Sequence, residues 1–225
     1  MDYLRWTIQW ATQAQRTLSD NGSFFLNIGG SPSHPLLPHE VLLALRGLFV
    51  LQNTIHWIKA ITVKTRSGEE ISAGHFKPIN SKRYLNNCHE YVFHLTKHGT
   101  KKIDRLGVGV AYADKSNIAR WGHTKGRDKR CRGNNWYIPY QTIQSRDAQR
   151  PHPATFPPEL PEMCIRLHGW RSNLVMLDPF LGIGHSALAA KKTGIREFWG
   201  FEIEQDYFAL AEEKLGVREV RHSAA

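Results

Sequence analysis

The first part of the chain combines one amphipathic helical segment with short apolar runs. Apolar residues recur at helical spacing over residues 2–18, which predicts a helix there. The positions that set this spacing are Leu4, Ile8, Ala11 and Leu18. A strong turn signal, Asp20-Asn21-Gly22, precedes residues 23–29, a mostly apolar stretch that predicts a strand. Because continuous apolar strands suit the buried middle of a parallel sheet, we expect this strand to lie there.

Further periodic segments follow before the pattern changes. Pro38 precedes a predicted helix at about residues 39–48, and residues 49–59 and 89–95 are predicted to be strands. From about residue 97 to 151, Lys, Arg, Gly and Asn dominate and periodicity is weak. Long irregular segments in compact domains are usually functional or disordered, and the aromatic residues interspersed in this one favour a functional role.

The last third of the chain alternates helices with strands. The segment PHPATFPPEL opens a predicted helix that ends at about residue 168. A predicted strand over residues 174–178 ends in an acid and leads through a glycine-rich turn into a helix over about residues 184–193. A strand over 197–203 and a helix over about 205–215 complete the pattern. Strands that alternate with helices are typical of an α/β fold.

The distribution of charge favours a polyanionic partner. The formal net charge is +10 and the isoelectric point is near 9.7, which fits either nucleic-acid binding or a generally basic, soluble protein. Residues 120–132 hold six Lys or Arg against one acid, Asp128. Acidic residues gather instead in the C-terminal stretch, at Glu197, Glu202, Glu204, Asp206, Glu212, Glu213 and Glu219. A chain with separate basic and acidic regions is expected to have one side for phosphates.

Composition excludes several other classes. Apolar residues make up 41% of the chain, but no stretch approaches the roughly 18 apolar residues of a membrane span, and the amphipathic N-terminus does not resemble a signal peptide. The cysteines, Cys88, Cys131 and Cys164, lie far apart, which predicts neither a disulfide framework nor a zinc site and fits a reducing cytoplasm. The twelve histidines form no metal-binding motif, so we predict no metal site.

The strongest motif joins an apolar strand, a glycine turn and a distant acid. The strand ends at Asp178, Gly182-Ile183-Gly184 permits a tight turn with close ligand approach, and the next strand ends near Glu202. This arrangement is typical of nucleotide-type cofactor sites, in which the acid accepts hydrogen bonds from ribose hydroxyls. The turn lacks the third glycine of the dinucleotide pattern, which disfavours an NAD-dependent dehydrogenase.

Several segments around this turn carry a family resemblance. They are Asp178-Pro179-Phe180-Leu181-Gly182-Ile183-Gly184, Ala189-Ala190, Gly200-Phe201-Glu202-Ile203-Glu204 with Tyr207, and, upstream, residues 152–160 (HPATFPPEL). Together they resemble the bacterial DNA N4-cytosine/N6-adenine methyltransferases, in which the upstream segment closes over the methionine end of the cofactor. The family's permuted order, with the cofactor motif after the recognition region, is also the order here. The likeness covers nearly the whole chain.

The resemblance implies an α/β, Rossmann-like S-adenosylmethionine-dependent methyltransferase fold with an inserted recognition lobe. Residues 1–96 would form the catalytic-side half of the sheet, incomplete at its N-terminus. Residues 97–150 would form the basic, irregular target-recognition region, and residues 151–225 the half that binds S-adenosylmethionine. The residues expected to hold this cofactor are Asp178, Phe180, Gly182, Gly184, Ser186, Glu202, His152, Thr155, Phe156 and Pro157.

By the same resemblance, the substrate is double-stranded DNA, methylated at cytosine N4 or adenine N6, with cytosine favoured on overall likeness. The residues expected to meet DNA are Lys125, Arg127, Lys129, Arg130 and Arg132 at the backbone and Trp136 at a base. The resemblance also implies a cytoplasmic, nucleoid-associated protein with a partner restriction endonuclease that acts on the same site. The sequence indicates neither the recognition site nor the oligomeric state.

Two departures from the family pattern affect the chemistry. The family usually has Ser and Thr where this chain has Ile183, His185 and Ser186, so some hydroxyl contacts to the cofactor are absent or replaced. The family's catalytic tetrapeptide, Asp/Ser/Asn-Pro-Pro-Tyr/Phe, has no copy in the sequence. That tetrapeptide accepts hydrogen bonds from the weakly nucleophilic exocyclic amine and stacks on the flipped base. We therefore assign no catalytic residue and expect the strand that carries the tetrapeptide to lie upstream of Met1.

Other functions stay open as alternatives. A truncated or catalytically inactive homologue would bind DNA, S-adenosylmethionine or both without turnover. A non-catalytic DNA-binding protein with the same fold would retain DNA without methyl transfer. An enzyme that methylates RNA or protein is disfavoured, because the two paired motifs resemble those of DNA methyltransferases.

Overall fold

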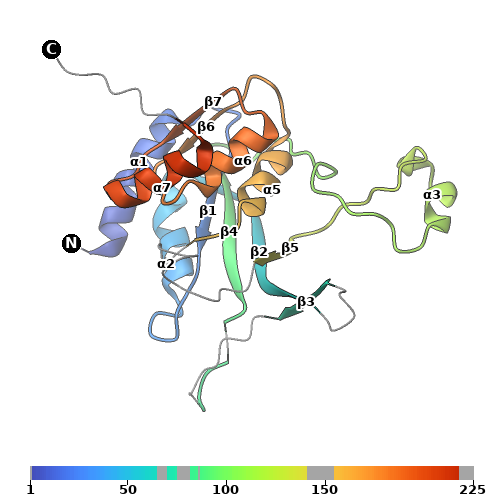
Figure 1. Ribbon diagram of the computed structural model, residues 1–225, viewed down its shortest axis with the longest axis horizontal. Helices are drawn as coiled ribbons and strands as arrows, with labels where there is room; N and C mark the ends of the chain where they lie inside the picture. Colours follow the sequence, from blue (N-terminus) through green and yellow to red (C-terminus); the bar gives the residue numbers. More distant parts are fainter. Residues whose placement is uncertain (1, 65–69, 75–81, 86, 141–154, 218–225) are drawn as a thin grey trace. The chain divides into compact units, whose positions relative to one another are not determined.

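The computed structural model describes residues 2–64, 70–74, 82–85, 87–140 and 155–217, and the chain divides into two compact units. Unit 1 comprises Met1–Pro139 and unit 2 comprises Tyr140–Ala225 (Figure 1). Each unit is mixed α/β, as the alternation of apolar patterns predicts. Within the described residues, no helix is both long enough and apolar enough to cross a lipid bilayer.

Unit 1 is built on a five-stranded sheet whose strand directions differ from the parallel arrangement expected for residues 23–29. The strands are β1 (Phe24–Ile28), β2 (Val50–Lys64), β3 (Glu70–Gly74), β4 (His89–Thr96) and β5 (Asn135–Tyr140). Their order is β1-β4-β2-β3, with β5 paired to β2. The antiparallel β4 lies between β1 and β2, so these two strands run parallel to each other without touching. The expectation that residues 23–29 pair within a parallel sheet is therefore wrong, because apolar character encodes burial and not the direction of the neighbouring strand.

Two helices cover one face of β4 in unit 1. The helix α1 (Tyr3–Thr17) begins where the Asp2 carboxylate accepts a hydrogen bond from the Leu4 amide, 3.2 Å away. The predicted second helix is divided into α2 (Leu37–Ala44) and the 3₁₀ turn η1 (Leu45–Gly47). The core that these elements share with the sheet consists of Ala11, Val41, Leu45, Phe49, Phe93 and Leu95. Because Phe93 and Leu95 alternate along β4, only one face of that strand is buried by the helices.

The segment between β4 and β5, which the sequence predicts to be irregular, extends from the sheet and contains short helical turns (Figure 1). We call residues 108–132 the arm; its tip carries α3 (Ser116–Arg120) and the 3₁₀ turn η2 (Gly122–Thr124). Val110 and Arg130 exchange backbone hydrogen bonds of 2.9 and 2.8 Å as an antiparallel bridge. The segment is therefore ordered as a two-stranded excursion. The strand β5 within 97–151 was missed by sequence reasoning, because its six residues, NWYIPY, include a proline.

Side chains complete the pairing of the arm on both sides of this bridge. On one side, Arg132 Nε donates to the Val108 carbonyl at 3.0 Å. On the other, the Tyr112 amide donates to Asp128 Oδ1 at 2.8 Å. The three connected pairs lie two residues apart on each strand, which is a regular antiparallel register. Only the central pair is held by backbone alone.

Unit 2 is a two-stranded parallel sheet with helices. Its elements are α5 (Glu159–His168), β6 (Val175–Asp178), α6 (His185–Thr193), β7 (Glu197–Gly200) and α7 (Gln205–Leu215). β6 and β7 pair from Val175 opposite Glu197 to Asp178 opposite Gly200. Phe198 packs with Leu181, Ala187 and Ala211 in a small core that joins the sheet to α6 and α7. The predicted strand 197–203 ends early, at Gly200, because the backbone of Phe201 bonds to the turn that follows β6.

A buried acid ties α5 to α6 in unit 2. Glu162 of α5 is 7% exposed, and its carboxylate lies 2.7 Å from both Arg166 Nη2 and Lys192 Nζ. Burial favours the neutral acid, but the hydrogen bonds and charges of Lys192 and Arg166 outweigh it and lower the pKa of Glu162. The carboxylate therefore stays ionised and holds the two helices together.

Candidate cofactor and nucleic-acid sites

The turn after β6 is fixed to the end of β7 by main-chain hydrogen bonds. We call residues 178–184 the glycine turn. The Phe201 amide donates to the Asp178 carbonyl at 3.0 Å, and the Leu181 amide donates to the Phe201 carbonyl at 2.8 Å. The Gly182 amide donates to Glu202 Oε2 at 2.7 Å. These bonds bring together the two ends of the motif that sequence analysis paired across twenty residues.

Two glycines of this turn adopt backbone conformations that other residues rarely take. Gly182 has φ 55° and Gly184 has φ 84°, both in the left-handed region. A Cβ atom on Gly184 would also lie 2.8 Å from the Cβ of Ala211 in α7. The glycine turn therefore needs glycine at Gly184 for two separate reasons, conformation and close packing.

Two carboxylates form hydrogen bonds with the glycine turn: Asp178 at its first residue and Glu202 after β7. Asp178 Oδ1 accepts from the Phe180 amide at 3.0 Å, while its Oδ2 accepts from the hydroxyl of Ser186, which is 2% exposed. Glu202 Oε1 accepts from the amides of Ile203 and Glu204, both at 2.9 Å. Both carboxylates are thus fixed by the backbone around them. A carboxylate held in this way is pre-oriented to accept hydrogen bonds from a ligand hydroxyl.

The upstream segment with the second family motif contacts the start of α6. His185 Nδ1 donates to the Phe156 carbonyl at 2.5 Å, because a carbonyl oxygen only accepts. Thr155, Phe156 and Pro157 are all partly buried in unit 2. His185, where the family usually has a hydroxyl residue, thus joins the two motifs. His152 lies outside the described residues.

Apolar side chains around the glycine turn face solvent. Phe180 is 50% exposed, Phe201 58% and Ile203 94%. Sequence reasoning selected Phe180 but missed Phe201 and Ile203. Their position directly beside an acid at the end of a strand is the signal that finds them, since a flat aromatic ligand needs apolar contacts beside its polar anchor.

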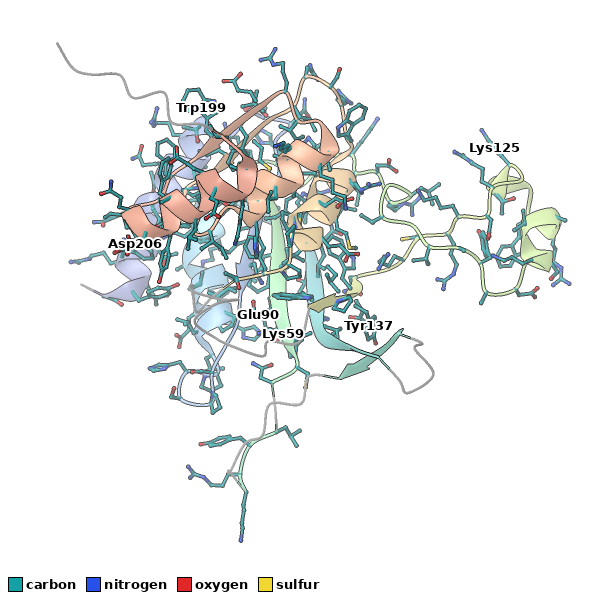
Figure 2. All side chains as sticks on the ribbon, in the orientation of Figure 1. Lys59, Glu90, Lys125, Tyr137, Trp199 and Asp206 are labelled. Carbon is teal, nitrogen blue, oxygen red and sulfur yellow. The ribbon has the colours of Figure 1, made fainter. Side chains whose placement is uncertain are left out.

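The predicted DNA-binding cations divide into two groups. Lys125, Arg127, Lys129 and Arg130 are exposed on the arm, and Lys125 lies at its far end (Figure 2). Lys125 has φ 51°, the one positive φ outside glycine in the described residues. Arg132, in contrast, is partly buried and its Nε donates to Val108, so this side chain also has a structural role. Near the tip, the Lys115 ammonium and then the Tyr112 amide lower the pKa of Asp128.

Trp136 does not lie where a base could stack on it. It is 1% exposed, and its indole N–H donates to the Gly133 carbonyl at 3.2 Å. The expectation that Trp136 contacts a base is wrong because side chains alternate along β5, and Trp136 and Ile138 lie on its buried side, 1% and 0% exposed. Exposed aromatic side chains are found instead at Tyr137, the next residue of β5, which is 62% exposed, and at Trp121 on the arm, which is 42% exposed.

Unit 1 also holds a pocket of about 220 Å³ between the segment after β1 and the start of β4. Its walls include Gly30, Pro38, Tyr84, His89 and Tyr91. The side-chain amide of Asn87 donates from Nδ2 to the Gly30 carbonyl at 3.0 Å, which ties two lining residues of the pocket together. Within the part of the chain that the structure describes, no cluster of three or more His, Cys, Asp or Glu is placed to hold a metal ion.

Comparison with known proteins identifies the family of this chain. The family model described as DNA methylase, of the N6/N4 type, matches residues 1–213. The chain belongs to this family. Its relatives include the type II methyltransferases M.ScaI of Streptomyces caespitosus, 27% identical, and M.SmaI of Serratia marcescens, 25% identical. These alignments cover 93% and 95% of this chain but 66% and 74% of the two relatives.

Solved structures of the DNA methylase fold are also similar. The PvuII DNA methyltransferase, which is cytosine-N4-specific, superposes over 100% of this chain and 73% of its own, with a TM-score of 0.65 and 18% identity. The complex of M1.HpyAVI with SAM covers 92% of this chain and 80% of its own, with a TM-score of 0.59 and 21% identity. At these identities the likeness establishes the Rossmann-like methyltransferase fold.

Proposed function

We propose that this chain acts in DNA methylation, moving a methyl group from S-adenosylmethionine to the exocyclic amine of cytosine (N4) or adenine (N6). The observation that carries the proposal is the glycine turn, bonded through Gly182 to Glu202 and joined through His185 to the Phe156 segment. Type II methyltransferases among the relatives support DNA as the substrate. A restriction endonuclease that cuts the same site is the partner that such relatives suggest.

The residues of unit 2 fit S-adenosylmethionine as a ligand. The positive φ of Gly182 and Gly184 leaves the backbone open for close approach, and the Glu202 carboxylate suits ribose hydroxyls. Phe180 and Ile203 offer apolar surface for the adenine. Thr155, Phe156 and Pro157 would lie along the methionine part, while Asp178 and Ser186 support the turn. When bound, the cofactor supplies an electrophilic methyl group.

The arm and the pocket of unit 1 suit DNA, the substrate that would accept the methyl group. Four exposed cations on the arm, Lys125, Arg127, Lys129 and Arg130, would meet phosphates, where each contact adds affinity without sequence preference. The pocket at His89 and Tyr91 has aromatic walls and a volume of about 220 Å³, which suit a single base turned out of the duplex. Excluding water there and holding the amine in place are the tasks we assign to these walls.

The chemistry of the transfer itself defines the decisive experiment. The exocyclic amine is a poor nucleophile, and the tetrapeptide that aligns it in the family does not occur in this sequence. Calorimetry should show S-adenosylmethionine binding that Glu202→Ala weakens at least tenfold, with no affinity for NAD. Transfer of labelled methyl groups to mixed-sequence DNA then tests turnover. Affinity for NAD in place of S-adenosylmethionine would overturn the proposal. Binding of S-adenosylmethionine and of DNA without methyl transfer would favour the inactive homologue.

A further inference from the structure

Imidazole and phenol side chains lie together on one face of the unit 1 sheet. The register places His56 of β2 opposite Tyr91 of β4, and residues that pair across strands share a face. The ring centres of His56 and His89 lie 5.9 Å apart, those of His56 and Tyr91 5.5 Å, and those of His89 and Tyr91 5.2 Å. We call His56, His89 and Tyr91 the imidazole row.

The imidazole row continues onto β5 at one end and into the pocket at the other. His56 Nδ1 lies 3.2 Å from Asn135 Oδ1, and Tyr137, two residues along β5, projects from the same face as Asn135. At the opposite end, His89 and Tyr91 line the pocket. Since adjacent strands are about 4.8 Å apart, the stretch from β5 across β2 to β4 spans roughly 10 Å, longer than the 3.4 Å rise of one nucleotide. It therefore connects the strand that follows the arm to the pocket.

One further imidazole, from α2, packs against the imidazole row. His39 of α2 packs edge-on against Tyr91 with ring centres 5.2 Å apart. Lys59 of β2 and Glu90 of β4 form an ion pair (Figure 2) on the opposite face of the sheet, because Glu90 pairs with Trp57 and Lys59 follows Trp57 by two residues. Burial, followed by the nearby His56 and Lys59, lowers the pKa of His89, and Glu90 only partly offsets this. A phosphate bound between two imidazoles would favour their charged forms and so oppose this effect.

The hydrogen bond of His56 fixes how it would meet an anion. An amide oxygen only accepts, so Nδ1 of His56 carries the proton in its bond to Asn135. Nε2 of His56 then becomes a donor only when the ring takes up a second proton. Charged imidazoles form short, strong hydrogen bonds to phosphate oxygens.

We propose that the imidazole row binds a backbone phosphate of the DNA strand beside the base in the pocket, and that it takes up a proton when it does so. Tyr137 then packs against the adjacent nucleotide, because its ring is exposed on the same face. This inference rests on the proposed function, since it requires DNA to occupy the arm and the pocket. Its consequence is DNA binding that strengthens as the pH falls toward 6.

The test measures binding of a short fluorescein-labelled duplex by anisotropy between about pH 6 and pH 8.5 at constant ionic strength. The variant His56→Gln/His89→Gln keeps polar side chains but cannot become charged. His98→Gln is the matched control, because His98 is an exposed histidine outside the row. We expect about a tenfold gain in wild-type affinity toward low pH, the same gain in His98→Gln, and little gain in the double variant. Tyr137→Ala should weaken binding by about tenfold at every pH.

Each outcome separates this inference from the proposed function. A double variant that keeps the full wild-type pH dependence overturns the imidazole row as a phosphate site, while DNA methylation stays intact as a proposal. Failure of wild type and control alike to bind DNA at any pH overturns both. Unfolding temperatures are measured in the same buffers. If His89→Gln weakens the fold, His56→Gln alone decides the question, because losing one of the two imidazoles should lessen the pH dependence.

Discussion

The glycine turn of unit 2 and the arm of unit 1 both combine backbone and side-chain hydrogen bonds, but they differ in the room they leave for a larger residue. In the glycine turn, backbone groups of Leu181, Gly182 and Phe201 make the bonds, and the glycines permit the conformation. In the arm, one backbone bridge is extended by side chains of Asp128 and Arg132. A Cβ atom on Gly184 of the turn would meet Ala211, whereas one on Gly126 of the arm would meet nothing within 4 Å. The arm depends instead on the bonding side chains of Asp128 and Arg132. The comparison therefore predicts which substitutions each region resists.

The largest effect is expected at Gly184. Gly184→Ala should destabilise the protein by about 2–4 kcal/mol, since the left-handed backbone costs about 1–2 kcal/mol and the contact with Ala211 adds overpacking. Gly194→Ala is the matched control, because Gly194 has φ 70° but a Cβ there would meet nothing within 4 Å. It should lose only about 1–2 kcal/mol. Urea unfolding measures both, and equal losses would contradict the packing half of the argument.

The next effect concerns the charge of the arm. Lys125→Ala/Arg127→Ala should weaken binding of mixed-sequence DNA and lower the slope of log affinity against log salt by about two, one for each lost phosphate contact. Arg5→Ala/Arg46→Ala removes the same charge from exposed positions on α1 and η1. A salt titration by anisotropy compares the two variants. The same slope in both variants would show that DNA affinity depends only on net charge and that the arm makes no phosphate contacts of its own.

A pH-dependent effect is expected where α5 supports α6. The pKa of Glu162 lies below its usual 4.5, so its ion pairs stabilise the fold fully above about pH 4.5 and lose this contribution as the pH falls through the lowered value. Glu162→Gln should cost about 1 kcal/mol at neutral pH, because both cationic partners are largely exposed. Thermal unfolding from about pH 3 to pH 7 should show the two proteins converging at low pH. A constant difference would mean that packing, not charge, is lost.

The smallest effect distinguishes two neighbouring arginines of the arm. Arg132→Ala removes the hydrogen bond to Val108 and should loosen the base of the arm by about 1 kcal/mol. Arg130→Ala removes an exposed side chain and leaves the backbone bridge to Val110 in place. Hydrogen exchange at the Val110 amide measures the difference. Faster exchange in Arg130→Ala than in Arg132→Ala would reverse the assignment of the two roles.

How far the sequence predicts the structure also differs between the two regions. The glycine turn could be located because glycine, acid and strand order each report a backbone requirement, and the structure brings Gly182 and Glu202 together as expected. The position of Trp136 could not be read from a basic, aromatic composition, because burial there depends on the alternation of β5. The direction of β1 was likewise hidden, since its partner β4 is distant in sequence. Contacts that depend on the backbone needs of a short motif can be predicted from the sequence, whereas those that depend on the pairing of distant strands cannot.

The paired side chains of the arm have a consequence for how such proteins diversify. Residues 113–127 at the tip are closed off by the bond between Tyr112 and Asp128, while Val110 and Arg130 carry the strand pairing behind it. The tip can therefore change in sequence without altering the sheet from which it extends. On the proposed function, changes confined to this loop would alter its contacts with DNA while the bridge and the sheet behind it stay as they are.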